Sequence, residues 1–175
     1  MSAQTTNRDL ASLNSLGPNE AEAEFLKCCG SRQWAQRMVQ ARPFATADQL
    51  TDSAQRVWWS LQPDDWLEAF RSHPKIGEQK AAAKTSVEAQ KWSETEQAGV
   101  AGSTENTLQS LADLNRDYER KFGYIFIVCA SGKSSGEMLG LLRNRMENEP
   151  GAELRIAAAE QARITELRLK KLTGV

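Results

Sequence analysis

Histidine is almost absent from this chain of 175 residues, which contains only His73. A single imidazole cannot supply the two or three histidine ligands that are common in catalytic zinc sites. The three cysteines are odd in number, and Cys28 and Cys29 are adjacent, so Cys129 has no obvious partner and neither a disulfide framework nor a zinc site is expected. His73 is also the side chain that titrates near neutral pH by default, which makes it the first candidate for proton chemistry.

An excess of charge of either sign is also absent. The chain carries 22 Lys and Arg against 23 Asp and Glu, with a pI near 6.0, so nothing indicates a nucleic-acid partner. No apolar run approaches the roughly 18 residues of a membrane span, and residues 1–7 lack the features of a signal peptide. We expect a cytoplasmic protein with no membrane partner and a frayed segment at residues 1–7.

Cofactor motifs are missing as well: there is no Gly-x-Gly-x-x-Gly, Walker loop or Gly-x-Ser-x-Gly elbow. We therefore expect no cofactor. The content of 40% hydrophobic and 26% charged residues is ordinary for a globular protein. The length fits one domain over residues 1–175.

Apolar residues recur at helical spacing along most of the chain and predict an all-α bundle of about eight helices. Thr46-x-x-Gln49, Ser93-x-x-Glu96 and Ser134-x-x-Glu137 have the spacing of capping boxes and predict helix starts. The last helix is predicted over about residues 150–172, and the tryptophans at helical positions are expected in the core. One segment breaks the pattern: residues 122–130 are β-branched and aromatic, which predicts an extended apolar segment within the bundle.

Two interpretations of His73 are open from its position. A short helix over residues 64–71 must end before Pro74, because proline disfavours α conformation at the preceding residue. The imidazole then either binds the last carbonyls of that helix as a C-cap or leaves the helix end to do chemistry.

The other polar candidates have two interpretations as well. Ser93, Glu96 and Gln97 are explained as a helix cap, yet a helix N-terminus with these side chains also suits a polar ligand. Arg168, on the charged last helix, is either a solvated surface residue or a ligand contact.

Five motifs occur in the order typical of one enzyme family, and together the chain resembles the OHCU decarboxylases from about Leu13 to Leu172. The motifs are His73-Pro74, Ser93-x-x-Glu96-Gln97, Tyr118-x-x-Lys121-Phe122-Gly123, Leu142-x-x-Arg145 and Ile164-x-x-x-Arg168-Leu169. The resemblance implies a carboxy-lyase that converts 2-oxo-4-hydroxy-4-carboxy-5-ureidoimidazoline (OHCU) to (S)-allantoin and CO2 in urate breakdown. It also implies an all-helical, cofactor-free homodimer.

The same resemblance implies roles for individual residues. His73 corresponds to the catalytic proton donor, and Glu96 and Arg168 to residues that act on the substrate with it. The implied substrate contacts are Pro74, Ser93, Glu94, Thr95, Glu96, Gln97, Phe126, Ile127, Val128, Cys129, Ala130 and Arg168. Two alternatives remain open: a helical binding or scaffold module without catalysis, and a ureide hydrolase.

Overall fold

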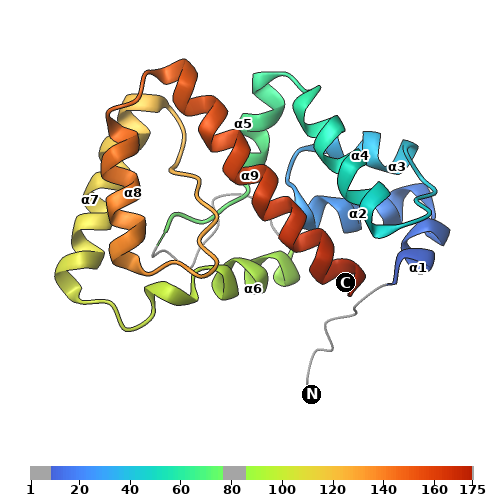
Figure 1. Ribbon diagram of the computed structural model, residues 1–175, viewed down its shortest axis with the longest axis horizontal. Coiled ribbons are helices and arrows are strands. Elements are labelled where there is room, and N and C mark those ends of the chain that lie inside the picture. Colours follow the sequence, from blue (N-terminus) through green and yellow to red (C-terminus); the bar gives the residue numbers. More distant parts are fainter. Residues whose placement is uncertain (1–8, 77–85, 175) are drawn as a thin grey trace. The chain divides into compact units, whose positions relative to one another are not determined.

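The computed structural model describes residues 9–76 and 86–174, so the expectation for residues 1–7 lies outside the described residues. Over the described ranges the chain forms nine α-helices and one short 3-10 helix, with no β-strand, which confirms the predicted all-α fold. In chain order the elements are α1 (Leu10–Ser15), α2 (Pro18–Cys28), α3 (Arg32–Gln40), α4 (Ala47–Trp59), α5 (Pro63–Arg71), α6 (Val87–Glu96), η1 (Ala98–Val100), α7 (Glu105–Phe122), α8 (Ser135–Met146) and α9 (Pro150–Thr173) (Figure 1).

The helices divide into two compact units. The first unit comprises Met1–Ala69 and Ala162–Val175, and the second comprises Phe70–Gln161. Helix α9 contributes residues to both units, because the division falls between Gln161 and Ala162. The single domain expected over residues 1–175 stays a prediction.

Two of the predicted capping boxes do begin helices. At α8 the box is complete: the Ser134 hydroxyl accepts from the Glu137 backbone N–H, and the Glu137 carboxylate accepts from the Ser134 N–H at 2.7 Å. At α4 the Thr46 hydroxyl accepts from the Gln49 N–H at 3.2 Å. The Gln49 side chain, however, accepts from the N–H of Ala45 rather than that of Thr46. This box is half formed, and the helix still begins at the predicted residue.

The helix start predicted at Ser93 is wrong. Helix α6 begins with Ser86 as its N-cap, whose hydroxyl accepts from the Ala89 N–H at 3.1 Å, and Glu96 is its last residue. Ser93 and Glu96 therefore lie in the last turn, where a helix presents carbonyl groups rather than N–H groups. A serine followed three residues later by a glutamate also occurs inside helices. Residues 88–91 are good helix formers, so the helix begins before Ser93 and continues past it.

An aromatic core stabilises the first unit, where α2 packs against α3 and α3 against α4. Phe25 and Trp34 are fully buried and meet edge to face, with ring centroids 5.8 Å apart. The Trp34 indole N–H donates to the Ala54 carbonyl at 3.2 Å, and the Trp66 N–H donates to the Trp58 carbonyl at 3.0 Å. These tryptophans are core residues, as the sequence predicted, but the prediction is wrong for Trp59, which is 43% exposed at the end of α4.

The second unit contains the extended segment, which we define as residues 124–130. Phe122 still ends α7, and Gly123 caps that helix in the left-handed conformation (φ +83°) that glycine adopts readily. Helices α7 and α8 pack together and run in the same direction, and the chain between them returns along their length (Figure 1). Two neighbouring helices that run parallel need a connection that leads from the end of the first back to the start of the second. The extended conformation supplies it with few residues, because it spans about 3.3 Å per residue against 1.5 Å in a helix.

Aromatic and aliphatic side chains from α7 and α8 bury the extended segment. Tyr118 of α7 is fully buried and meets the Phe126 ring edge to face, with centroids 5.5 Å apart. The buried core of the second unit consists of Ile76, Leu111, Tyr118, Phe126, Val128, Ala130, Met138, Leu139 and Leu142.

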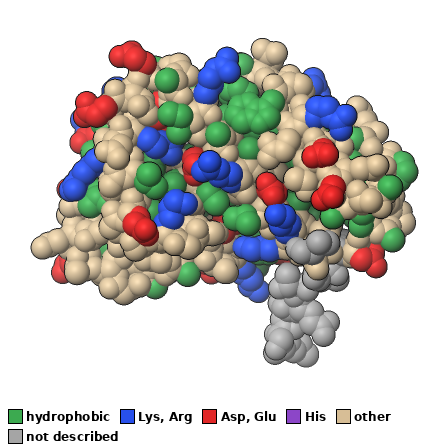
Figure 2. All heavy atoms as spheres, viewed as in Figure 1, with side chains coloured by type: hydrophobic (Ala, Val, Ile, Leu, Met, Phe, Trp, Pro, Cys, Tyr) green, Lys and Arg blue, Asp and Glu red, His purple; other side chains and the backbone are tan. Residues whose placement is uncertain are grey.

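Charged side chains of both signs are interspersed on the face drawn in Figure 2, in keeping with the balanced composition. Among the described helices, none has the length and apolar character that crossing a membrane requires.

Candidate active site

The single histidine lies two residues beyond the end of α5, where Pro74 prevents the helix from continuing. Its backbone N–H donates to the Phe70 carbonyl at 3.2 Å and closes the helix end. The imidazole is buried, with 8% of His73 exposed. Its Nε2 lies 2.6 Å from Oε1 of Gln161 on α9. The ring thus contacts a side chain of α9, and its role in chemistry stays a prediction.

Gln161 is a candidate functional residue that the sequence did not identify. Its place in the apolar stripe of the last helix made it look like an ordinary core position. Its amide group could have identified it, because a polar side chain at a buried position needs a hydrogen-bond partner. Gln161 is fully buried among alanine and aliphatic positions of α9, and the imidazole is one of its hydrogen-bond partners.

The backbone of the extended segment finds its partners in side chains rather than in a sheet. Arg145 of α8 donates to the Ile127 carbonyl at 2.6 Å, and Lys133 donates to the Cys129 carbonyl at 2.8 Å. The Cys129 N–H donates to a carboxylate oxygen of Glu160 at 2.7 Å. The predicted segment is confirmed as extended, and the need of its backbone for partners outside a ladder is met in this way.

Consecutive residues of α9 hold the histidine and the extended segment. Glu160 binds the backbone N–H of Cys129, and Gln161 binds the imidazole of His73. One turn of a single helix therefore fixes both parts of the candidate site in the second unit.

The predicted stretch from Ser93 to Gln97 is divided by the helical period. Ser93 and Glu96 are buried, whereas Glu94 and Thr95 are exposed. Residues three apart share a helix face, so Ser93 and Glu96 point inward together. The Ser93 hydroxyl donates to the Ala89 carbonyl at 3.1 Å. The ligand-binding N–H groups expected here are absent, because this end of α6 is its C-terminus.

Electrostatics connect Glu96 with the extended segment. Burial raises the pKa of the Cys129 thiol, and the nearby charges of Glu160 and Glu96 raise it further, while Lys133 acts against them. Two carboxylates from α6 and α9 thus act on the same position of the extended segment. A neutral thiol is a much weaker nucleophile than a thiolate.

A buried ion network supports the extended segment from its other side. The Arg145 guanidinium contacts Oε1 of Glu153 through Nε at 2.6 Å and through a terminal nitrogen at 2.5 Å. Tyr118 donates its hydroxyl to the same carboxylate, and Asn148 donates to the other oxygen at 2.8 Å. Burial and the Glu153 charge raise the pKa of Tyr118 well above its ordinary value, so the phenol stays a donor. With its hydrogen bond to the Ile127 carbonyl, Arg145 joins this network to the segment.

Arg168 belongs to the first unit. It is 4% exposed and donates to the Lys27 carbonyl at 3.3 Å, where α2 presents its unsatisfied carbonyls. Its charge also lowers the pKa values of Cys28 and Cys29, although burial outweighs this effect and raises both, that of Cys29 to about 12. The interpretation of Arg168 as a solvated surface residue is therefore wrong. That Arg168 acts on the same substrate as His73 and Glu96 stays a prediction.

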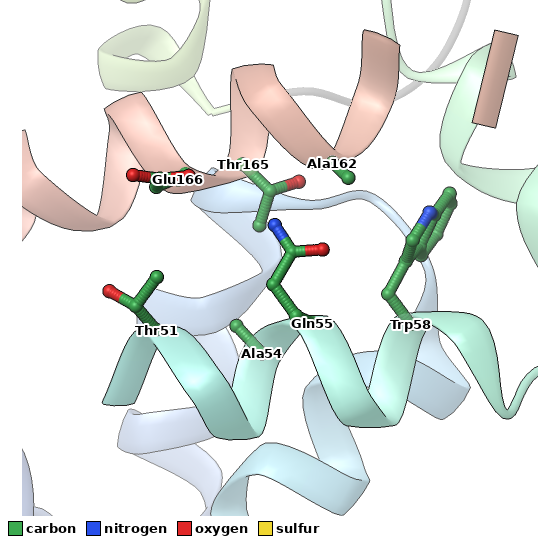
Figure 3. A pocket seen from close by; sticks show the side chains of 7 residues that line it. All are labelled: Thr51, Ala54, Gln55, Trp58, Ala162, Thr165 and Glu166. Atoms are coloured by element: carbon green, nitrogen blue, oxygen red, sulfur yellow. The ribbon is translucent and has the colours of Figure 1, made fainter. Parts of the chain in front are cut away.

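A shallow hollow in the first unit lies between α4 and α9, and Figure 3 shows Gln55 of α4 pointing toward Thr165 of α9. The space that it encloses is far smaller than the roughly 300–1,000 Å³ of a typical small-molecule site, so we do not assign a ligand to it. Over residues 9–76 and 86–174, no three His, Cys, Asp or Glu side chains are grouped so that they could hold a metal ion.

Comparison with protein families identifies one match that covers most of the chain. The model of the OHCU decarboxylase family matches residues 14–170. The chain belongs to the OHCU decarboxylase family. The resemblance inferred from five short motifs is thereby confirmed, and its expected limits, Leu13 to Leu172, agree closely with the matched range.

Relatives of this OHCU decarboxylase family member come from plants and archaea among other sources. The uric acid degradation bifunctional protein TTL of Arabidopsis thaliana is 41% identical over 86% of this chain. The chain spans about half the length of that relative, 47%. The 2-oxo-4-hydroxy-4-carboxy-5-ureidoimidazoline decarboxylase of Haloferax volcanii is 26% identical, and the match covers 77% of each chain.

A solved structure of the same family is similar over its whole length. An OHCU decarboxylase crystallised in the presence of (S)-allantoin shares 40% identity and superposes with a TM-score of 0.76, covering 87% of this chain and 99% of the other. An (S)-allantoin synthase with 19% identity and a TM-score of 0.69 shows the same fold.

Proposed function

We propose that this protein decarboxylates OHCU to (S)-allantoin and CO2 in urate breakdown. Membership of the OHCU decarboxylase family over residues 14–170 carries the proposal. The position of the single histidine supports it, because His73 is buried, held by Gln161 and located in the same unit as the extended segment and Glu96.

The chemistry suits a protein with this inventory of residues. Loss of CO2 leaves the electron pair of the broken C–C bond on the substrate, and many decarboxylases accept it on a cofactor. The conjugated C=N of the OHCU ring can accept the pair itself. The protein then positions the ring, favours loss of the carboxylate charge and delivers one proton to carbon. We assign that proton transfer to His73, since an imidazole titrates near neutral pH.

The neighbouring side chains orient the substrate. Glu96, which is buried at the end of α6, accepts hydrogen bonds from the ureido N–H groups. Ser93 on the same helix face and Pro74 beside the histidine add contacts. The apolar side chains of the extended segment keep the site dry, and a low dielectric constant strengthens these polar interactions. The remaining proposed contacts are Glu94, Thr95, Gln97, Phe126, Ile127, Val128, Cys129 and Ala130.

Arg168 is the proposed contact for the carboxylate or a ring carbonyl. A guanidinium binds such groups in a planar, bidentate geometry that lysine cannot reproduce. Its hydrogen bond to the Lys27 carbonyl orients the guanidinium within the first unit.

We further propose that the protein works without a cofactor and as a homodimer, both of which its family implies. The cytoplasmic location stays a prediction.

The direct experiment is to generate OHCU freshly from urate and to follow its decay and the optical activity of the product. We expect the protein to accelerate the decay and to yield (S)-allantoin. Turnover should be the same after exhaustive chelation and dialysis. A folded protein that leaves the decay rate unchanged would contradict the proposed function, and activity lost on chelation and restored by a metal would contradict its mechanism.

A further inference from the structure

We propose that Gln161 is a positioning residue that keeps His73 protonated at Nε2, so that Nδ1 is the nitrogen that transfers a proton to the substrate. This inference rests on the proposed function for its catalytic part. The hydrogen bond itself can be tested without any substrate. Nothing in the resemblance to the family or in the motifs pointed to Gln161.

The amide oxygen of Gln161 is the atom that faces the ring. The separation between Nε2 and Oε1 is 2.6 Å. This separation is slightly shorter than the usual N–H···O range of about 2.7–3.2 Å. The amide oxygen has no proton to give, so the imidazole must donate. The neutral ring is then the Nε2–H tautomer.

Burial makes this arrangement persistent. Gln161 is fully buried and His73 nearly so, and water therefore competes little for either group. A buried amide oxygen left without a donor destabilises the folded protein. Rotating the amide would remove that donor and bring its NH2 group against Nε2. The single orientation of Gln161 thus fixes both the angle of the ring and its tautomer.

The tautomer decides which nitrogen does the chemistry. In the imidazolium form both nitrogens carry protons, and the amide oxygen of Gln161 keeps the one on Nε2. As CO2 leaves, the electron pair of the broken C–C bond passes into the ring of the substrate and then forms the new C–H bond. The proton comes from Nδ1, whose N–H bond breaks. The imidazole is left neutral with Nε2–H still bonded to Gln161, and water restores the Nδ1 proton.

The lone histidine allows a direct test, because selective ¹⁵N-histidine labelling gives one imidazole spin system in the whole protein. Long-range ¹H–¹⁵N spectra distinguish the two tautomers of a neutral ring. We would record them near pH 9, well above the ordinary histidine pKa of about 6.5. We expect the wild-type protein to be almost entirely the Nε2–H tautomer.

Substitutions at position 161 separate the hydrogen bond from packing. Gln161→Leu has a similar size but no acceptor, and we expect it to give a mixture of tautomers. Gln161→Glu can only accept and should retain the Nε2–H tautomer. Gln109→Leu is the matched control, since Gln109 is exposed on α7 and bonds to Asp113; it should leave the spectrum unchanged.

Turnover gives the second measurement. We expect Gln161→Leu to lower kcat by about 10- to 100-fold with a smaller change in KM, comparable to losing the outer partner of a ligating histidine. Gln161→Glu should recover much of that loss.

Three spectral results would overturn the proposal: an Nδ1–H tautomer in the wild-type protein, an unchanged tautomer in Gln161→Leu, or a wild-type ring still doubly protonated near pH 9, which would mean that an anion governs it. If the spectra agree but no variant turns over OHCU, the hydrogen bond stands and the proposed function fails.

Discussion

The two units of this protein use buried polar groups differently. In the first unit the indole N–H groups of Trp34 and Trp66 donate to backbone carbonyls within an aromatic core, and the hydroxyl of Thr173 donates to the Leu169 carbonyl of its own helix. In the second unit buried side chains bind one another across long sequence separations, as in His73 with Gln161 and Tyr118 with Glu153. Networks of this kind stabilise a fold only when every member is satisfied. They also place chemically active groups with precision, which is what a catalytic site requires.

The largest effect should follow from breaking the proposed chemistry in the second unit. His73→Asn should lower kcat for OHCU by about 10²–10⁴-fold, the usual worth of general acid–base help. Asparagine keeps a polar side chain at this buried position, so the melting temperature should change little. Rates from OHCU decay and thermal unfolding would be measured on the same preparations. Substantial activity in a well-folded variant would remove His73 from the mechanism.

The ion network should show the next largest effect, this time on stability. Arg145→Met leaves the fully buried Glu153 without its cation, and losing one partner of a buried ion pair costs about 3–5 kcal/mol. The control is Arg116→Met, because Arg116 and Asp113 form an exposed pair on α7, a type worth about 0–1 kcal/mol. Urea unfolding would compare the two. Equal losses in the free energy of unfolding would mean that the buried ion pair contributes no more to stability than the exposed pair.

The proposed substrate contacts should have intermediate effects. Glu96→Ala and Arg168→Ala each remove a charged hydrogen-bonding group, worth about 1.5–3 kcal/mol, or roughly 10- to 150-fold in kcat/KM. Arg168→Lys should recover only part of the loss, because an ammonium lacks the planar fork. Steady-state kinetics on OHCU would measure all three. Full activity of Arg168→Lys would argue against a bidentate contact.

A further effect should appear at alkaline pH, and the buried thiols of the first unit contribute to it. Burial raises the pKa of Cys29 from 9.0 to about 12 and that of Cys28 also upward. Between the ordinary thiol pKa of 9.0 and the raised pKa values of the folded state, the folded protein keeps thiol protons that the unfolded chain loses. The free energy of unfolding therefore falls as the pH rises above 9. The slope is about 1.4 kcal/mol per pH unit for each thiol.

Cys28→Ser and Cys29→Ser should flatten this slope in urea unfolding series from pH 8 to 11. Both variants, and Cys129→Ser in the second unit, should turn over OHCU at nearly the wild-type rate. An unchanged slope would contradict the burial argument, and lost turnover in a folded variant would indicate a thiol role.

The sequence predicted the fold through local signals. Ser134 and Glu137 form their capping box because only neighbouring residues take part, and helical periodicity located α9 to within one residue at its C-terminus. The same kind of signal failed at Ser93, because a four-residue spacing fits both the start of a helix and its last turn.

The site was only partly predictable for a related reason. His73 was conspicuous as the one histidine, whereas its partner Gln161 is 88 residues away and lies in an apolar stripe. Helical periodicity predicts that such a side chain points inward, but it does not identify the side chain that it contacts. Arg145 was noticed only as a motif position, and its contacts with Glu153 and the Ile127 carbonyl depend on three separate elements.

The central claim is that His73 delivers the proton that sets the handedness of the product. The most direct test is the enantiomeric ratio of allantoin formed from fresh OHCU by the wild-type protein and by His73→Asn, measured by circular dichroism at equal conversion. The wild-type protein should give (S)-allantoin alone, and the variant should give the racemic mixture expected of unassisted protonation. Pure (S)-allantoin formed by a folded His73→Asn variant at the wild-type rate would contradict the account.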